Sequence, residues 1–280
     1  MTIRRSVLVV GVLAATLAGC PPDEASAPDV TWDEVSPPSE GDAAGGREYA
    51  LIVRMRMVTI SVPLGAASGS EQLWSYLNTE AIEAVRTGSL GRNGLRAGLA
   101  PRESWQDVAD VLEQMTGTRR KTTVMTCLPG GAVSVEVRRD QPMQTLFVYN
   151  RDRTLSGRDY PPADNLLTFF CSLNPDDPSQ VTLTVLPQLR TARRRPAVVN
   201  RGEVPMIASR PTYFSFEDLA FRVTVPSRDV LIIGPGSGSR RSSSVGNRFL
   251  LKRRDGVPHE TVLVVIPQVI AAKHNADGAT

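Results

Sequence analysis

The hydrophobic pattern first predicts a strand that runs from about residue 48 to Pro63. Within this segment Val53, Met55 and Met57 are separated by arginines at positions 54 and 56. Alternation of apolar and charged residues is typical of a half-buried strand, because successive side chains point to opposite faces. We therefore expect the two arginines to face solvent and the apolar residues to face a core.

Two amphipathic helices are predicted next. The first begins at Ser70 and the second at Ser104, and apolar residues follow each serine at helical spacing. The apolar faces consist of Leu73, Trp74 and Leu77 in the first helix and Val108, Val111, Leu112 and Met115 in the second. Gly117 is placed to act as the C-cap of the second helix.

Glycines separate the two predicted helices. They occur at positions 88, 91, 94 and 98 and predict that the first helical region ends before them. The pair Asn93-Gly94 is flanked by apolar residues, which is typical of a tight hairpin turn. Residues 48–120 therefore read as a mixture of strands and helices.

From residue 121 onward the pattern changes to short strands separated by turns. The predicted strands cover residues 122–128, 132–137, 145–149, 166–171, 181–186, 219–225, 230–233, 248–252 and 262–266. The arginine-rich segment 190–196 reads as a basic joint between two halves. Many short strands with frequent proline and glycine turns are typical of packed antiparallel sheets.

The two halves contain a weak internal repeat. Residues 178–190 and 258–270 are related by an offset of 80 positions, and both contain a Pro-Gln pair. A duplication would explain this likeness, and so would the general similarity of strands that end in proline.

Together these elements predict an α+β fold that is predominantly β, with antiparallel strands. The expected organisation is a signal peptide (1–19), a Pro-rich tether (20–47), an α+β region (48–120), a β-rich region (121–196), a second β-rich region (197–272) and a polar tail (273–280).

The first twenty residues resemble the signal peptide of a bacterial lipoprotein. Arg4 and Arg5 precede an apolar run at 6–17, which is too short to span a bilayer as a helix. The sequence LAGC at 17–20 resembles the lipobox of that family. The resemblance implies acyl chains on Cys20 that anchor the protein in the membrane, and it favours the outer membrane. The simpler alternative is an ordinary signal peptide with a chance cysteine.

Charge separates the tether from the rest of the chain. The whole chain has 32 Lys+Arg and 29 Asp+Glu, a formal net charge of +3. Seven of the acidic residues lie in the tether, so that residues 48–280 hold 29 basic and 22 acidic residues. We therefore expect a basic body on an acidic leash, near a negatively charged surface.

Clustered basic residues are the candidate binding groups. They are Arg190, Arg193, Arg194, Arg195, Lys252, Arg253 and Arg254. On one face they would bind an anionic envelope ligand, such as a lipid head group or a wall polymer. The alternative is a solvated surface, which is what most runs of charge are. Nucleic acid is not an expected partner, because aromatic residues do not interleave with these clusters.

The sequence shows no catalytic constellation. It has two histidines, no zinc-binding HExxH and no nucleophile motif of the G-x-S-x-G type. We therefore expect neither an enzyme nor a metal or cofactor. Cys127 and Cys171 remain after lipidation, and an exported protein permits a disulfide between them. Two separate buried thiols are the alternative.

Three segments resemble the conserved C-terminal module of bacterial secretins. They are VTLTVLPQL (181–189), FRVTVPSRDVLIIGPG (221–236) and ETVLVVIPQVI (260–270), and VRMRMVTISVPLG (53–65) resembles the strand before the secretin core. Gly234-Pro235-Gly236 stands where that family has a Gly-Gly pair. The resemblance implies a structural or interaction role in a secretin-like envelope assembly, with envelope proteins or further copies of this chain as partners.

Overall fold

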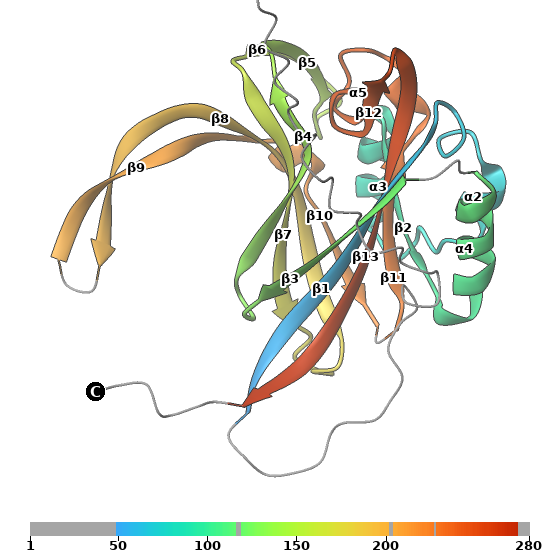
Figure 1. Cartoon of the computed structure of the whole chain (residues 1–280), viewed down its shortest axis with the longest axis horizontal. Helices are drawn as coiled ribbons and strands as arrows, with labels where there is room; N and C mark the ends of the chain where they lie inside the picture. The colour runs from blue at the N-terminus through green and yellow to red at the C-terminus, as the bar shows by residue number, and fades with distance from the viewer. Residues whose placement is uncertain (1–48, 116–118, 202–203, 227, 274–280) are drawn as a thin grey trace, which may run out of the picture.

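The computed structural model describes residues 49–115, 119–201, 204–226 and 228–273. Within these residues the chain forms three layers: helices, a six-stranded sheet and a five-stranded sheet (Figure 1). The expected signal peptide, the tether, Cys20, Gly117 and all of the polar tail except its first residue lie outside the described residues.

The six-stranded sheet joins the two ends of the described chain. Its strands are β1 (Tyr49–Pro63), β2 (Leu95–Ala100), β3 (Arg119–Cys127), β11 (Val230–Pro235), β12 (Leu251–Arg254) and β13 (Val257–Lys273). Their order is β2-β11-β13-β1-β3, with β12 paired to β13, and every pair is antiparallel. β1 and β13 pair along their whole length, so strands from before residue 120 and after residue 197 share one sheet.

The five-stranded sheet packs against the first. It consists of β4 (Ala132–Gln141), β7 (Ala163–Leu173), β8 (Val181–Arg201), β9 (Val204–Ser215) and β10 (Phe221–Val225). The order is β10-β8-β7-β4, and β9 pairs with β8 beyond the end of β10. A separate hairpin of β5 (Gln144–Tyr149) and β6 (Leu155–Tyr160) lies beside this sheet (Figure 1).

Short helices complete the fold. They are α2 (Glu71–Ser75), α3 (Ala84–Arg92), α4 (Trp105–Gln114) and α5 (Val245–Leu250), with 3-10 turns η1 (Arg102–Ser104), η2 (Glu217–Leu219) and η3 (Ser237–Arg240). The Ser70 side chain accepts a hydrogen bond from the amide of Leu73, which caps α2 as its position in the sequence predicts. No helix in the described part of the chain is long and apolar enough to cross a membrane.

The second half of β1 is buried on both faces because it lies between the helices and the five-stranded sheet. Met55 and Met57 face the five-stranded sheet, whereas Val58 and Ile60 pack under α2 and α4. Arg54 is exposed and the next arginine along the strand is half-buried. The alternation in the sequence therefore predicted the strand and its inward face correctly.

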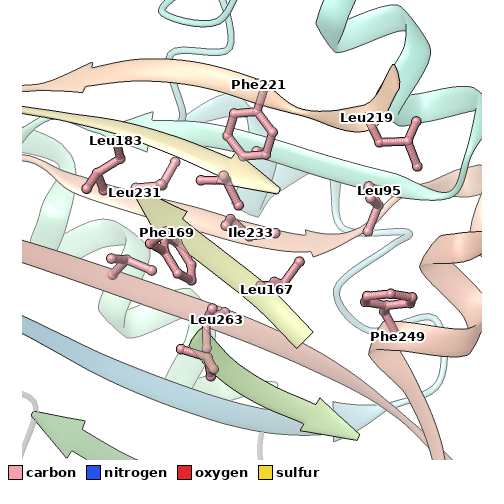
Figure 2. Packing of buried hydrophobic residues seen from close by; sticks show 14 of the residues in the cluster. Leu95, Leu167, Phe169, Leu183, Leu219, Phe221, Leu231, Ile233, Phe249 and Leu263 are labelled. Carbon is pink, nitrogen blue, oxygen red and sulfur yellow. The ribbon is translucent and has the colours of Figure 1, made fainter. Parts of the chain in front are cut away.

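The main core fills the space between the two sheets (Figure 2). Leu231 and Ile233 of β11 and Leu263 of β13 face Phe169 of β7 and Leu183 of β8, and all five are buried. Burying a large apolar side chain contributes about 1.5–3 kcal/mol. This interface between the sheets therefore holds the body together, and the fold is predominantly β and antiparallel, as the sequence predicted.

Two predicted local structures are wrong around the glycines and at residue 248. The helix α3 includes Gly88 and Gly91, and Asn93-Gly94 ends that helix instead of turning a hairpin. Gly94 has φ +80°, and a Cβ there would lie 2.6 Å from the amide nitrogen of Ser239. The residues predicted as strand 248–252 instead begin in α5, whose N-cap is a serine side chain.

The predicted basic joint at 190–196 is also wrong. β8 continues through it without a break to Arg201, and β9 returns alongside. β6 and β9 were both missed by sequence reasoning. The prolines of the repeat, Pro187 and Pro267, lie inside β8 and β13 and do not end them. Duplication stays a hypothesis, and the two strands belong to different sheets.

Candidate interaction surface

The longest hairpin of the protein leaves the body at Thr191. Up to that residue β8 pairs with β7 on one side, and the last of these pairs is Ala163↔Thr191. Beyond it β8 pairs only with β9, from Arg194↔Pro211 to Arg201↔Val204. We call residues 192–201 and 204–212 the ribbon, and Figure 1 shows it curving away from the rest of the molecule.

The ribbon begins at an irregularity in the pairing. Between Arg190 and Arg194 the register shifts, because β8 advances four residues while β9 advances two. The buried hydroxyl of Thr191 lies 3.2 Å from the carbonyl oxygen of Thr212 and provides a donor where the ladder is interrupted. Such bulges bend a strand pair and increase its twist, which accounts for the direction that the ribbon takes.

Large apolar side chains are exposed near the end of the ribbon. Val198 and Ile207 form one cross-strand pair and are 72% and 79% exposed, and Met206 is 47% exposed. Four exposed arginines lie closer to the body: Arg193, Arg194, Arg195 and Arg210. The ribbon therefore has positively charged residues next to the body and exposed apolar residues near its far end.

Both edges of the ribbon lack a neighbouring strand within the part of the chain that is described. Along the ribbon, the backbone groups of successive cross-strand pairs point alternately towards the partner strand and away from it. The pair Val198↔Ile207 belongs to one of these two alternating sets, and the same set contains Pro196, Pro205 and Pro211. Proline cannot donate to a strand ladder, so this set is the one whose backbone groups point outward. Beyond the first pair, Arg194↔Pro211, the outward amides that remain belong to Val198 and Asn200 on β8 and to Ile207 and Ser209 on β9.

Arg190 is a structural residue and not part of an exposed basic patch. Its guanidinium forms ion pairs with Glu136 of β4 and, at 2.7 Å, with Asp164 of β7. The hydrogen bond from Arg190 is the main reason that the pKa of Glu136 is lowered. The carboxylate of Asp164 also accepts a hydrogen bond from the amide of Asp140. Arg190 therefore ties three strands together below the base of the ribbon.

The remaining predicted basic residues divide between two places. Arg193, Arg194 and Arg195 are exposed on the ribbon, whereas Lys252, Arg253 and Arg254 belong to β12 on the body (Figure 1). They do not share one face. Arg254 lies 3.8 Å from the carboxylate of Asp255, and the other two line a cavity.

That cavity is also lined by Arg138, Arg240 and Arg248. They come from β4, η3 and α5, which are far apart in the sequence. The run Lys252-Arg253-Arg254 and the basic pair Arg240-Arg241 were the signals of this site in the sequence, whereas Arg138 and Arg248 were missed. Its other members become visible only when the fold brings the elements together.

Cys127 and Cys171 are both buried free thiols in the structure. Cys127 is the last residue of β3 and Cys171 lies in β7, so the two cysteines belong to different sheets. Burial raises the pKa of Cys171, and so does the neighbouring thiol of Cys127. The two thiols therefore lie side by side, and the disulfide stays a prediction. In the described residues no three His, Cys, Asp or Glu side chains gather as a metal site would need.

Comparisons with known proteins give only distant matches. No family model matches the sequence, and no curated protein matches it. A Klebsiella pneumoniae type II secretion system outer membrane complex of PulD, PulS and the PulC HR domain matches with a TM-score of 0.23 and 9% identity. That match covers 80% of this chain and 40% of the other.

Two further solved structures match at the same level. Aeromonas hydrophila ExeD has a TM-score of 0.21 and 10% identity over 80% of this chain and 49% of its own. The InvG secretin domain β-barrel from Salmonella has a TM-score of 0.21 and 6% identity over 82% and 66%. The chain thus spans less than half the length of the first two. These values are low, and what links this chain to them is a remote similarity to secretin structures.

Proposed function

We propose that this protein is an exported, lipid-anchored component of a bacterial envelope assembly, in which copies associate through the ribbon in a secretin-like arrangement. The observation that carries the proposal is the ribbon itself, with its open edges and exposed apolar end. The lipobox-like sequence at 17–20 supports the anchor, and the distant matches agree with an envelope role.

Strand pairing is the mode of association that the ribbon favours. A two-stranded hairpin is marginally stable by itself in water, and stability requires further strands or packing. Exposed edges with unpaired N–H and C=O groups are templates for another strand. A neighbour beside Val198 would satisfy the outward groups of β8, and a neighbour beside Ile207 would satisfy those of β9, and each would pack against the apolar side chain next to it.

A second copy of this chain is the partner that the topology favours. β4 forms one edge of the five-stranded sheet. The ribbon extends from β8 and β9, at the other edge of the same sheet. Pairing of the ribbon of one copy with β4 of the next would be head-to-tail. Repeated head-to-tail contacts close into a ring when the rotation permits. The arginines at the base would then lie towards the anionic lipid in which the acyl chains are anchored.

The proposal is tested by the mass of the mature lipidated chain in mild detergent, measured by light scattering. We expect a discrete large oligomer. The double variant Val198→Lys and Ile207→Lys should be monomeric, because charges at the contact oppose strand addition. The matched control is Val124→Lys on β3, where the valine is 56% exposed, and this variant should assemble like the wild type. A monomeric wild-type protein would overturn the proposal.

Anchoring is tested separately by fractionation of cells. The wild-type protein should sediment with membranes, and Cys20→Ala should not, because several acyl chains are required for stable anchoring. If the Cys20→Ala variant still sediments in the absence of assembly, the lipid anchor is refuted.

A further inference from the structure

A basic cavity on the body, distant from the ribbon, has no part in strand pairing. Its volume is about 780 Å³, which is within the range of small-molecule sites. It is bounded by β4, η3, α5, the hairpin of β12 and β13, and the loop that follows β1. Five cationic side chains line it: Arg138, Arg240, Arg248, Lys252 and Arg253. We call it the basic pocket.

The single carboxylate that lines the basic pocket is already used elsewhere. Glu260 is 1% exposed, and its carboxylate accepts hydrogen bonds of 2.9 Å from the amides of both Ala67 and Ser68. The Ser68 hydroxyl donates to its second oxygen. Within the described residues no acidic side chain lies within ion-pair distance of any of the five cations. Positive charge in the basic pocket is therefore largely uncompensated.

Arg138, Arg248 and Lys252 are half-buried, whereas Arg240 and Arg253 are exposed. Burial lowers the pKa of Lys252, and the nearby charge of Arg138 lowers it further. Burial likewise lowers the pKa of Arg138, with a second contribution from Arg248. Arg138 is fixed in place because its guanidinium donates to the carbonyl oxygen of Leu251. Like charges that are held near one another repel, and an anion between them would relieve this repulsion.

Arg248 lines the basic pocket from α5. Its Nε atom is buried and has no hydrogen-bond partner among the described residues. A buried donor without a partner is unfavourable, so such groups are rare in folded proteins. Because Nε itself is closed to solvent, an anion in the basic pocket would bind the outer nitrogens of this guanidinium.

We propose that the basic pocket binds a phosphate ester, with the phosphate held by Arg138, Arg248 and Lys252. Guanidinium groups present parallel N–H donors that match the oxygens of phosphate, and lysine adds a compact charge. Leu64, Leu251 and Pro258 also line the cavity and provide apolar surface for the organic part of the ligand. Neither a single carboxylate nor an apolar ligand would neutralise this set of charges.

The ligand has two sources with the same chemistry, a soluble phosphate ester or an anionic lipid head group. Titration calorimetry of the mature chain with glycerol 3-phosphate tests the first. Co-sedimentation of the non-lipidated Cys20→Ala chain with phosphatidylglycerol vesicles, against phosphatidylcholine vesicles, tests the second. Binding in either arm supports the proposal and identifies the source. Binding in neither arm overturns it, and so does citrate binding as tightly as glycerol 3-phosphate.

Variants separate the basic pocket from general surface charge. Lys252→Met and Arg248→Met should each weaken binding by about tenfold or more, as loss of a charge-assisted hydrogen bond does. The matched control is Arg194→Met on the ribbon, which should change the affinity by less than about twofold. Equal weakening by the control would show that the ligand responds to net charge only, and would overturn the proposal.

Folding of the pocket variants is checked by a second measurement. Glycerol 3-phosphate should raise the melting temperature of the wild-type protein, because a ligand stabilises the state that it binds. The pocket variants should melt cooperatively and show no such rise. The ribbon double variant should bind as the wild type does, so failure of assembly and failure of ligand binding remain distinguishable.

Discussion

The two parts of β8 differ in what surrounds them. From Val181 to Leu189 the strand has neighbours on both sides and its inward side chains are buried in the core. Beyond Thr191 the same strand has one neighbour, and Val198 is largely exposed. The first part of β8 is therefore a central strand of a packed sheet, whereas its last part is one strand of an exposed two-stranded hairpin. Under the proposed function, the body folds by itself and the ribbon is completed by association.

The largest expected difference between these parts is in stability. Phe169→Ala in the core should lower the free energy of unfolding by about 3–5 kcal/mol, because it leaves a cavity between the sheets. Ile207→Ala on the ribbon should change it by less than about 0.5 kcal/mol in the monomer. Urea unfolding of both variants in a monomeric background measures this. Equal losses would mean that the ribbon belongs to the folded body.

The cysteine pair gives the next largest effect. A disulfide between Cys127 and Cys171 would close a loop and join the sheets, and should stabilise the body by about 4 kcal/mol. Urea unfolding with and without reductant measures the difference, and thiol labelling of the denatured protein counts free cysteines. Complete labelling of both residues in protein isolated from the envelope would show that they are separate buried thiols.

The Arg190 ion pairs should give a smaller, pH-dependent effect. Arg190→Met should destabilise the body by about 1 kcal/mol at neutral pH, since the ion pairs are partly exposed. The pKa of Glu136 is lowered in the folded protein, so its contribution is present above the ordinary carboxyl pKa and is lost as the pH falls below it. Unfolding measured from pH 7 to pH 3 should therefore show the wild type and the variant converging in acid. A constant difference would contradict this role.

Sequence reasoning predicted best where one period of hydrophobicity is unbroken. β1 alternates cleanly around Arg54, and α4 has apolar residues three and four positions apart, so both were found with nearly correct bounds. It failed where tertiary contacts override local signals. Gly88 and Gly91 remain helical because α3 is held against neighbouring elements, and α5 is too short to show a helical period.

The candidate sites were harder to predict for related reasons. β9 contains three residues of types that usually mark loops, namely Pro205, Ser209 and Pro211, which occur here because they lie on an open edge. In the basic pocket, Arg248 is a lone arginine in the sequence and Arg138 is followed only by Arg139, and only the fold brings both beside β12. Runs of charge are visible in a sequence, but convergence from distant elements is not.

Hydrogen exchange at the outward amides of the ribbon tests the central claim most directly. In the assembled wild-type protein we predict slow exchange at Val198, Asn200, Ile207 or Ser209, on whichever edge receives the neighbouring strand. The same amides should exchange rapidly in the monomeric Val198→Lys and Ile207→Lys variant, while core amides of β7 stay protected in both. Rapid exchange at all four amides within an assembled wild-type protein would contradict association through the ribbon.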